Sequence, residues 1–146
     1  MGIFITRMPK GIDEFEIQNR ITQLKYHNEV FPRTNNVLGF LNAIKDVKED
    51  FIFLKRYEKK YPKYFNPKPS DALAQFNSNM PMIERNFIDR YVQTIERKLL
   101  DYSTIRGKRN NLNKMVDIFR YYAEEFLPET LEYFDEILKS RFSDYL

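Results

Sequence analysis

The sequence predicts an all-α fold, a helical bundle of about five helices, on three observations. Apolar residues recur at alternating three- and four-residue steps along most of the chain, whereas the period-two alternation of a strand is not sustained beyond the first few residues. Prolines mark breaks between these periodic stretches. With 146 residues, 42% of them hydrophobic and 16% aromatic, the chain can bury one continuous core. We therefore expect a single helical domain over residues 1–146, with an extended N-terminal segment at 1–11.

Two helices are expected in the first half of the chain. The first spans about residues 12–27, where Asp13 and Glu14 suit the positive N-terminal end of a helix. The second is a long central helix over residues 35–61. Its apolar positions are Val37, Phe40, Ile44, Val47, Phe51, Leu54 and Tyr61, and Leu41, Ile52 and Phe53 widen the face. So wide a face indicates a helix covered by several partners rather than a two-stranded coiled coil.

A stiff, proline-rich connection is expected at residues 62–70, because three prolines there prevent a continuous helix. Ser70 or Asp71 would cap the next turn of helix, over residues 72–76. Pro81 suits the first turn of a further helix, which we expect to run to about residue 104 and to end at Gly107.

Two more helices are expected in the last third, marked by apolar spacing over residues 112–126 and 131–145. Pro128 separates them, since proline has no N–H and its ring clashes with the carbonyl four residues back. The chain must therefore kink or restart near residues 126–127, which predicts a Pro-kinked C-terminal helix pair.

Four glutamates follow one stripe of this last region: Glu125, Glu129, Glu132 and Glu136. The stripe lies away from Leu131, Phe134 and Leu138, so we expect it to face solvent, with Glu129 favoured near a helix N-terminus. Catalytic carboxylates would need a pocket that separates their pKa values, and nothing in the sequence suggests one.

Other catalytic and metal-binding patterns are missing. The chain has one histidine, His27, with no glutamate three residues before it, and we expect it to cap a helix or lie on the surface. It has no cysteine, no glycine-rich phosphate loop and no G-x-S-x-G. We therefore expect no catalytic residues, no metal and no cofactor. No apolar run approaches the length of a membrane span, and the cytoplasm is the expected location.

Charge is distributed unevenly along the chain. Residues 51–70 hold six Lys or Arg against one acid, a net +5, while residues 123–146 hold two basic and seven acidic residues, a net −5. The basic stretch is mixed with tyrosines, as in nucleic-acid-binding surfaces. The candidate nucleic-acid-binding residues are Lys55, Arg56, Lys59, Lys60, Lys63, Tyr64 and Lys68. The same residues also suit the C-terminal end of a helix whose aromatic side chains pack in the core.

The stretch MVDIFRYYAEEFLPETLEYFDEIL, preceded by FIDRYVQTIERKLLDY, resembles the C-terminal part of the XpaC-like proteins, which are named for hydrolysis of an indolyl phosphate. The resemblance covers residues 83–139 and rests on Tyr121, Tyr122, Leu127, Pro128, Thr130 and Leu131. It implies a helical protein, and it supplies no catalytic residues for this chain.

Three functions are consistent with these observations. The first is a non-catalytic helical module for protein–protein interaction, with an unknown protein or a second copy of the chain as its partner. The second is a nucleic-acid-binding accessory protein that uses residues 55–68. The third, implied by the resemblance alone, is a phosphoester hydrolase or its helper.

Overall fold

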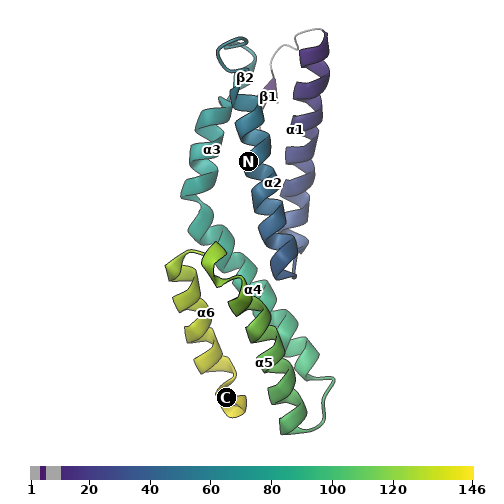
Figure 1. Cartoon of the computed structure of the whole chain (residues 1–146), viewed down its shortest axis with the longest axis vertical. Helices are drawn as coiled ribbons and strands as arrows, with labels where there is room; N and C mark the ends of the chain where they lie inside the picture. The colour runs from purple at the N-terminus through teal and green to yellow at the C-terminus, as the bar shows by residue number, and fades with distance from the viewer. Residues whose placement is uncertain (1–3, 6–10) are drawn as a thin grey trace. The chain divides into compact units, whose positions relative to one another are not determined.

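A computed structural model describes residues 4–5 and 11–146 and confirms the all-α prediction. These residues form six α-helices (Figure 1): α1 (Ile12–Val30), α2 (Val37–Lys55), α3 (Pro69–Ser78), α4 (Met80–Leu99), α5 (Ile105–Tyr121) and α6 (Pro128–Arg141). Three 3₁₀ turns accompany them: η1 (Phe31–Arg33), η2 (Ala123–Glu125) and η3 (Ser143–Tyr145). Two short strands, β1 (Phe4–Ile5) and β2 (Phe65–Asn66), pair antiparallel. Of the expected extended segment 1–11, residues 1–3 and 6–10 lie outside the described residues.

The described residues group into two compact units. Unit 1 takes its residues from 1–33 and 42–79, and unit 2 consists of 34–41 and 80–146. The first turn of α2 thus belongs to unit 2 and the rest of that helix to unit 1. The single domain expected from the length stays a prediction.

Unit 1 packs α1 and α3 on either side of α2 (Figure 1). Each helix buries side chains at helical spacing, as expected for amphipathic segments. These are Ile17, Ile21 and Leu24 in α1, Val47, Phe51 and Leu54 in α2, and Ala72 and Phe76 in α3. An ion pair also joins α1 and α2, in which Arg20 donates to Asp50 at 2.9 Å.

Unit 2 packs α4, α5 and α6 around an aromatic core (Figure 1). The rings of Phe119 and Phe134 lie 4.2 Å apart, and those of Phe40 and Phe87 lie 4.3 Å apart and nearly parallel. Phe126 fills the space between these pairs and is buried. Aromatic pairs at such separations add to the free energy gained from burying their area.

The helix at 35–61 is shorter than predicted, because α2 ends at Lys55. Tight turns follow, in which the Tyr57 N–H bonds to the Leu54 carbonyl at 3.0 Å. Tyr61 fits the apolar spacing of α2 although it lies beyond the end of that helix. The Tyr61 hydroxyl donates to Asp13 in α1 at 2.7 Å, so this tyrosine is held by a neighbouring helix and not by a continuation of its own.

Two predictions around prolines and glycines were wrong in detail. Helix α3 begins at Pro69 and runs for ten residues rather than the five at 72–76, with Lys68 in the N-cap position. Helix α4 ends at Leu99, not near residue 104. Gly107 does not end a helix but lies in the first turn of α5, where its N–H donates to the Oγ1 of the N-cap residue Thr104 at 3.0 Å.

Of the two alternatives at Pro128, the chain restarts rather than kinks. Helix α5 ends at Tyr121, η2 follows, and Phe126 and Leu127 are extended. Pro128 is then the first residue of α6, the helical position in which its missing N–H costs no hydrogen bond.

Candidate functional site

A surface groove follows the junction of α4 and α5 in unit 2. It consists of two clefts, of about 290 and 390 Å³, and Lys98, Met115 and Ile118 line both of them. The first cleft extends toward Asn36 and Thr94, and the second toward Tyr102 and Lys114. The shared residues make the two clefts one continuous groove with an apolar centre and basic side chains beside it.

A buried tyrosine fixes the floor of this groove. The Tyr91 hydroxyl, from α4, donates to the backbone carbonyl of Met115 in α5 at 2.6 Å. Burial raises the pKa of Tyr91 to about 12, because the phenolate would lose its hydration. The hydroxyl therefore stays protonated at physiological pH and keeps α4 and α5 in register beneath the groove.

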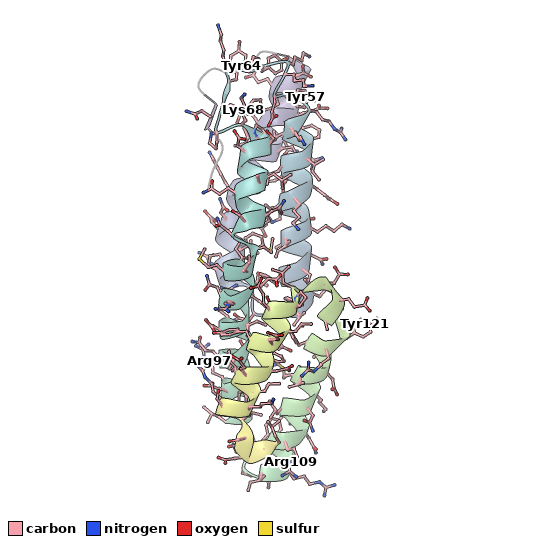
Figure 2. All side chains as sticks on the ribbon, turned by 90° about the vertical axis from the view of Figure 1, so that its left-hand side faces the viewer. Tyr57, Tyr64, Lys68, Arg97, Arg109 and Tyr121 are labelled. Atoms are coloured by element: carbon pink, nitrogen blue, oxygen red, sulfur yellow. The ribbon has the colours of Figure 1, made fainter. Side chains whose placement is uncertain are left out.

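An exposed stripe of α5 runs along one side of the groove. Asn111, Lys114, Ile118 and Tyr121 follow at steps of three, four and three residues, which places them on one face of the helix. Ile118 is 48% exposed and Tyr121 81%, and Figure 2 shows Tyr121 directed away from the ribbon. Two large apolar side chains one turn apart are thus left uncovered beside an apolar groove.

The residues that carried the family resemblance do not form one site. Tyr121 is exposed, with the ring of Tyr122 edge-on to it at 4.9 Å. Thr130 is buried, and Leu127 and Leu131 are half-buried. Tyr121 and Pro128 are thus exposed, while Thr130 belongs to the packing of α6.

Glu84 is a buried acid that the sequence analysis missed. Its Oε1 accepts the N–H of Leu127 at 3.0 Å and the hydroxyl of Thr130 at 2.6 Å. Both donors belong to the start of α6, where backbone N–H groups lack partners within the helix. Glu84 stands among the apolar positions Met80, Phe87 and Ile88 of α4, and an acid in such a position is the signal that could have revealed it.

The four glutamates Glu125, Glu129, Glu132 and Glu136 are exposed, as predicted, but they do not share one helix. Glu125 lies in η2 and the other three lie in α6. Two other acids of unit 2, Asp135 in α6 and Glu96 in α4, pair with arginines. Arg120 pairs with Asp135, and Glu96 pairs with Arg141 at 3.2 Å. The stripe gives unit 2 an acidic surface.

The basic side chains of the stretch are exposed. The side chains of Lys55, Arg56, Lys59, Lys60, Lys63 and Lys68 face solvent, and Tyr64 is half-buried. Figure 2 shows Tyr57, Tyr64 and Lys68 at the same end of unit 1. Lys60 is held by Asp13, and this ion pair lowers the pKa of Asp13 and raises that of Lys60.

A polar cleft on unit 1 lies between α1 and α2. His27 and Asp50 are buried beside it. Of the two positions expected for His27, the surface is therefore wrong, while His27 does lie in the last turn of α1. Burial raises the pKa of Asp50, an effect that the Arg20 guanidinium opposes. The His27 Nε2 lies 3.9 Å from Asp46. The cleft therefore concentrates charge, but its basic and acidic groups face each other rather than a common centre.

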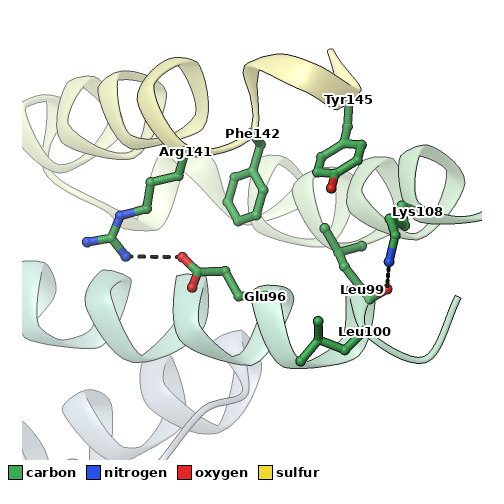
Figure 3. A pocket seen from close by; sticks show the side chains of 7 residues that line it. All are labelled: Glu96, Leu99, Leu100, Lys108, Arg141, Phe142 and Tyr145. Carbon is green, nitrogen blue, oxygen red and sulfur yellow. Dashed lines mark hydrogen bonds and ion pairs between the residues drawn. The ribbon is translucent and has the colours of Figure 1, made fainter. Parts of the chain in front are cut away.

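Another cleft, of about 460 Å³, lies near the C-terminal end of α6 (Figure 3). Its charged groups bond within the protein. The Lys108 Nζ donates to the Leu99 carbonyl at 2.7 Å, and Arg141 bridges to Glu96. Lys108 thereby satisfies a carbonyl at the end of α4, and the cleft braces helix ends rather than presenting charge to a ligand.

Neither a metal centre nor a membrane span is found in the part of the chain that the structure describes. No three His, Asp or Glu side chains among residues 4–5 and 11–146 are grouped so that they could hold a metal ion. Within the same residues, no helix combines the length and the apolar character needed to cross a bilayer.

Comparisons of the chain with family models, with curated proteins and with solved structures found no match. The resemblance of residues 83–139 to XpaC-like proteins therefore stays a prediction, and so does the hydrolase or helper role that it implies. The candidate function rests on the groove and the charged surfaces alone.

Proposed function

We propose that the protein is a non-catalytic interaction module that associates with a second copy of itself through the exposed stripe of α5. The observation that carries the proposal is the pair Ile118 and Tyr121, uncovered beside the α4–α5 groove. Covering two large apolar side chains in each of two copies removes apolar area from water and is favourable at about 25 cal/mol per Å².

The stripe is self-complementary in a way that suits a two-fold dimer. When two copies of α5 pack antiparallel about a point between Asp117 and Ile118, Lys114 of one copy meets Tyr121 of the other, and the reverse contact repeats the first. An ammonium group over an electron-rich ring is attracted to it. The two Ile118 side chains then meet at the centre, which gives an apolar middle with a cation and a ring at each end.

Charge reversal at the centre of the stripe tests the proposal. We expect Ile118→Glu to make the protein monomeric in sedimentation velocity at concentrations where the wild type is a dimer, since it would bury two like charges together. Ile52→Glu is the matched control, because Ile52 is 51% exposed in α2 and lies outside the stripe. It should leave the dimer intact.

Two results would contradict the proposal. One is a wild-type monomer at every concentration, and the other is equal loss of the dimer in both variants. Circular dichroism of each variant checks that the helices are retained, so that a loss of association is not confused with unfolding.

A further inference from the structure

We propose that residues 55–68 form a second binding site, for the phosphate backbone of double-stranded nucleic acid, contacted without sequence preference. This basic segment extends from the end of α2 to the start of α3 in unit 1. The site is separate from the α5 stripe, and the proposal does not depend on association of two copies.

The first support is unbalanced, accessible charge. The segment carries six exposed basic side chains and one acid, Glu58. The Oε1 of Glu58 accepts the backbone N–H of Ser70, and one acid offsets only one of the six basic charges. Among the described residues, Lys55, Lys59 and Lys68 form no ion pair, and Arg56 lies over the Phe53 ring at 5.8 Å without a carboxylate partner.

The second support is that acids of α1 hold the segment in place. Asp13 accepts from both Lys60 and the Tyr61 hydroxyl, and Glu16 accepts from the Tyr57 hydroxyl at 3.0 Å. These bonds anchor the turns after α2 to the first turns of α1. The remaining basic side chains are therefore displayed on an ordered backbone, which lowers the entropy lost on binding.

The aromatic side chains decide between ways of binding. Tyr57 and Tyr61 stack on each other at 6.4 Å, and Tyr61 contacts Tyr64 edge-on at 5.5 Å. The rings are thus engaged with one another and half-buried, which disfavours stacking on unpaired bases. No large apolar side chain of residues 55–68 is exposed, so nothing there would insert into a lipid surface. Of the three modes of binding, contact with backbone phosphates is the one that the side chains of this segment favour.

Double-stranded nucleic acid should bind this basic surface more tightly than an acidic protein does. Its phosphates carry one charge per about 1.7 Å of axis, and each phosphate neutralised releases condensed counterions. Binding should therefore be independent of sequence and steeply dependent on salt. If Lys55, Arg56, Lys59 and Lys68 each neutralise one phosphate, the slope of log K against log salt is about −3.6.

The experiment measures fluorescence anisotropy of a labelled DNA duplex across a salt series. We expect the triple variant Lys55→Gln, Lys59→Gln, Lys68→Gln to bind about tenfold or more weakly, with a slope shallower by about 2.7. The matched control, Arg97→Gln, Arg106→Gln, Lys139→Gln, removes the same charge from exposed positions of unit 2. Figure 2 marks Lys68 and Arg97, one from each set. The control should keep the wild-type slope.

Four results would overturn the proposal. The duplex does not bind at low salt; the two triple variants lose binding equally; a single strand binds more tightly than the duplex; or phosphatidylserine vesicles bind with the same dependence on the three lysines. Sedimentation without DNA adds a check, since a change of mass in the lysine variant would assign the segment to contact between copies instead.

Discussion

At the scale of single residues, Glu84 shows how an acid can belong to a core. Its carboxylate is buried in α4, yet it accepts two hydrogen bonds from the start of α6. Leu127, the N-cap residue of α6, offers no side-chain acceptor to its own helix. Glu84 supplies that acceptor from a neighbouring helix, and the usual cost of burying a carboxylate is offset by the hydrogen bonds it receives.

Thr130→Val tests this role. The change keeps the shape of the side chain but removes the hydroxyl that donates to Glu84. We expect the free energy of unfolding to fall by about 1–3 kcal/mol, because a buried acceptor loses one of its two donors. Urea denaturation measures it.

Thr94→Val is the control, because the Thr94 hydroxyl donates to the Arg90 carbonyl of its own helix at 2.9 Å. That carbonyl can also accept from the helix backbone, so the control should lose less. Equal losses in the two variants would show that the hydrogen bond to Glu84 stabilises the fold no more than a bond within one helix does.

Asp50 gives a residue-scale prediction for pH. Burial raises its pKa above the ordinary value of 3.8, so the folded protein holds this proton more tightly than the unfolded chain does. The resulting stabilisation is complete below about pH 3.8 and is lost as pH rises through the folded-state pKa. Relative to Asp50→Asn, which cannot titrate, the wild type should therefore become less stable as pH rises.

Urea denaturation of both proteins over a pH series gives this difference directly, because the other titrating groups are common to the two. If the wild type instead becomes more stable than Asp50→Asn as pH rises, the ion pair with Arg20, at 2.9 Å, outweighs the burial of Asp50.

At the scale of helices, the start of α6 is fixed by its surroundings as well as by Pro128. We expect Pro128→Ala to leave that start in place and to change the free energy of unfolding by less than about 1 kcal/mol. The Leu127 N–H remains bound to Glu84, which holds the extended backbone before the helix. Carbon chemical shifts of residues 122–130 report the result. Helical shifts throughout would show that Pro128 alone keeps α5 and α6 apart.

The sequence predicted the elements better than it predicted their ends. Long amphipathic spacing found α1, α4 and α6, because burial of one face determines both the spacing and the helix. The predicted ends were wrong where a hydrogen bond to a polar side chain, and not the apolar spacing, decides them. Tyr61 continued the spacing of α2 because Asp13 holds it, and Gly107 suggested an end although Thr104 caps a new helix there. Hydrogen bonds across 48 residues leave no local pattern.

At the scale of the whole molecule, charge and apolar surface are used in separate places. The basic segment belongs to unit 1, while the α5 stripe and the acidic stripe belong to unit 2. The sequence indicated the charged segments, since runs of like charge are visible in it. It did not single out Ile118, because the sequence pattern does not distinguish a buried apolar residue of a helix from an exposed one.

The separation predicts how association responds to salt. An interface centred on Ile118 and Tyr121 depends on apolar burial, which salt does not screen, whereas a head-to-tail contact between residues 55–68 and 123–146 would weaken over a Debye length of about 10 Å at 0.1 M salt. We therefore expect the sedimentation mass of the wild type to be unchanged between low and high salt. Dissociation by salt alone would favour the head-to-tail contact.

The hydrogen bond that Glu84 accepts from the start of α6 also bears on the order in which the chain is made and folds. Glu84 precedes Leu127 by 43 residues, so during synthesis its carboxylate leaves the ribosome well before the helix that it will cap. Starting a helix is the slow, unfavourable step, and elongation is easy once the first turn exists. An acceptor already held in α4 can template that first turn when residues 127–130 emerge. The last helix thus begins against a residue that was made 43 positions earlier.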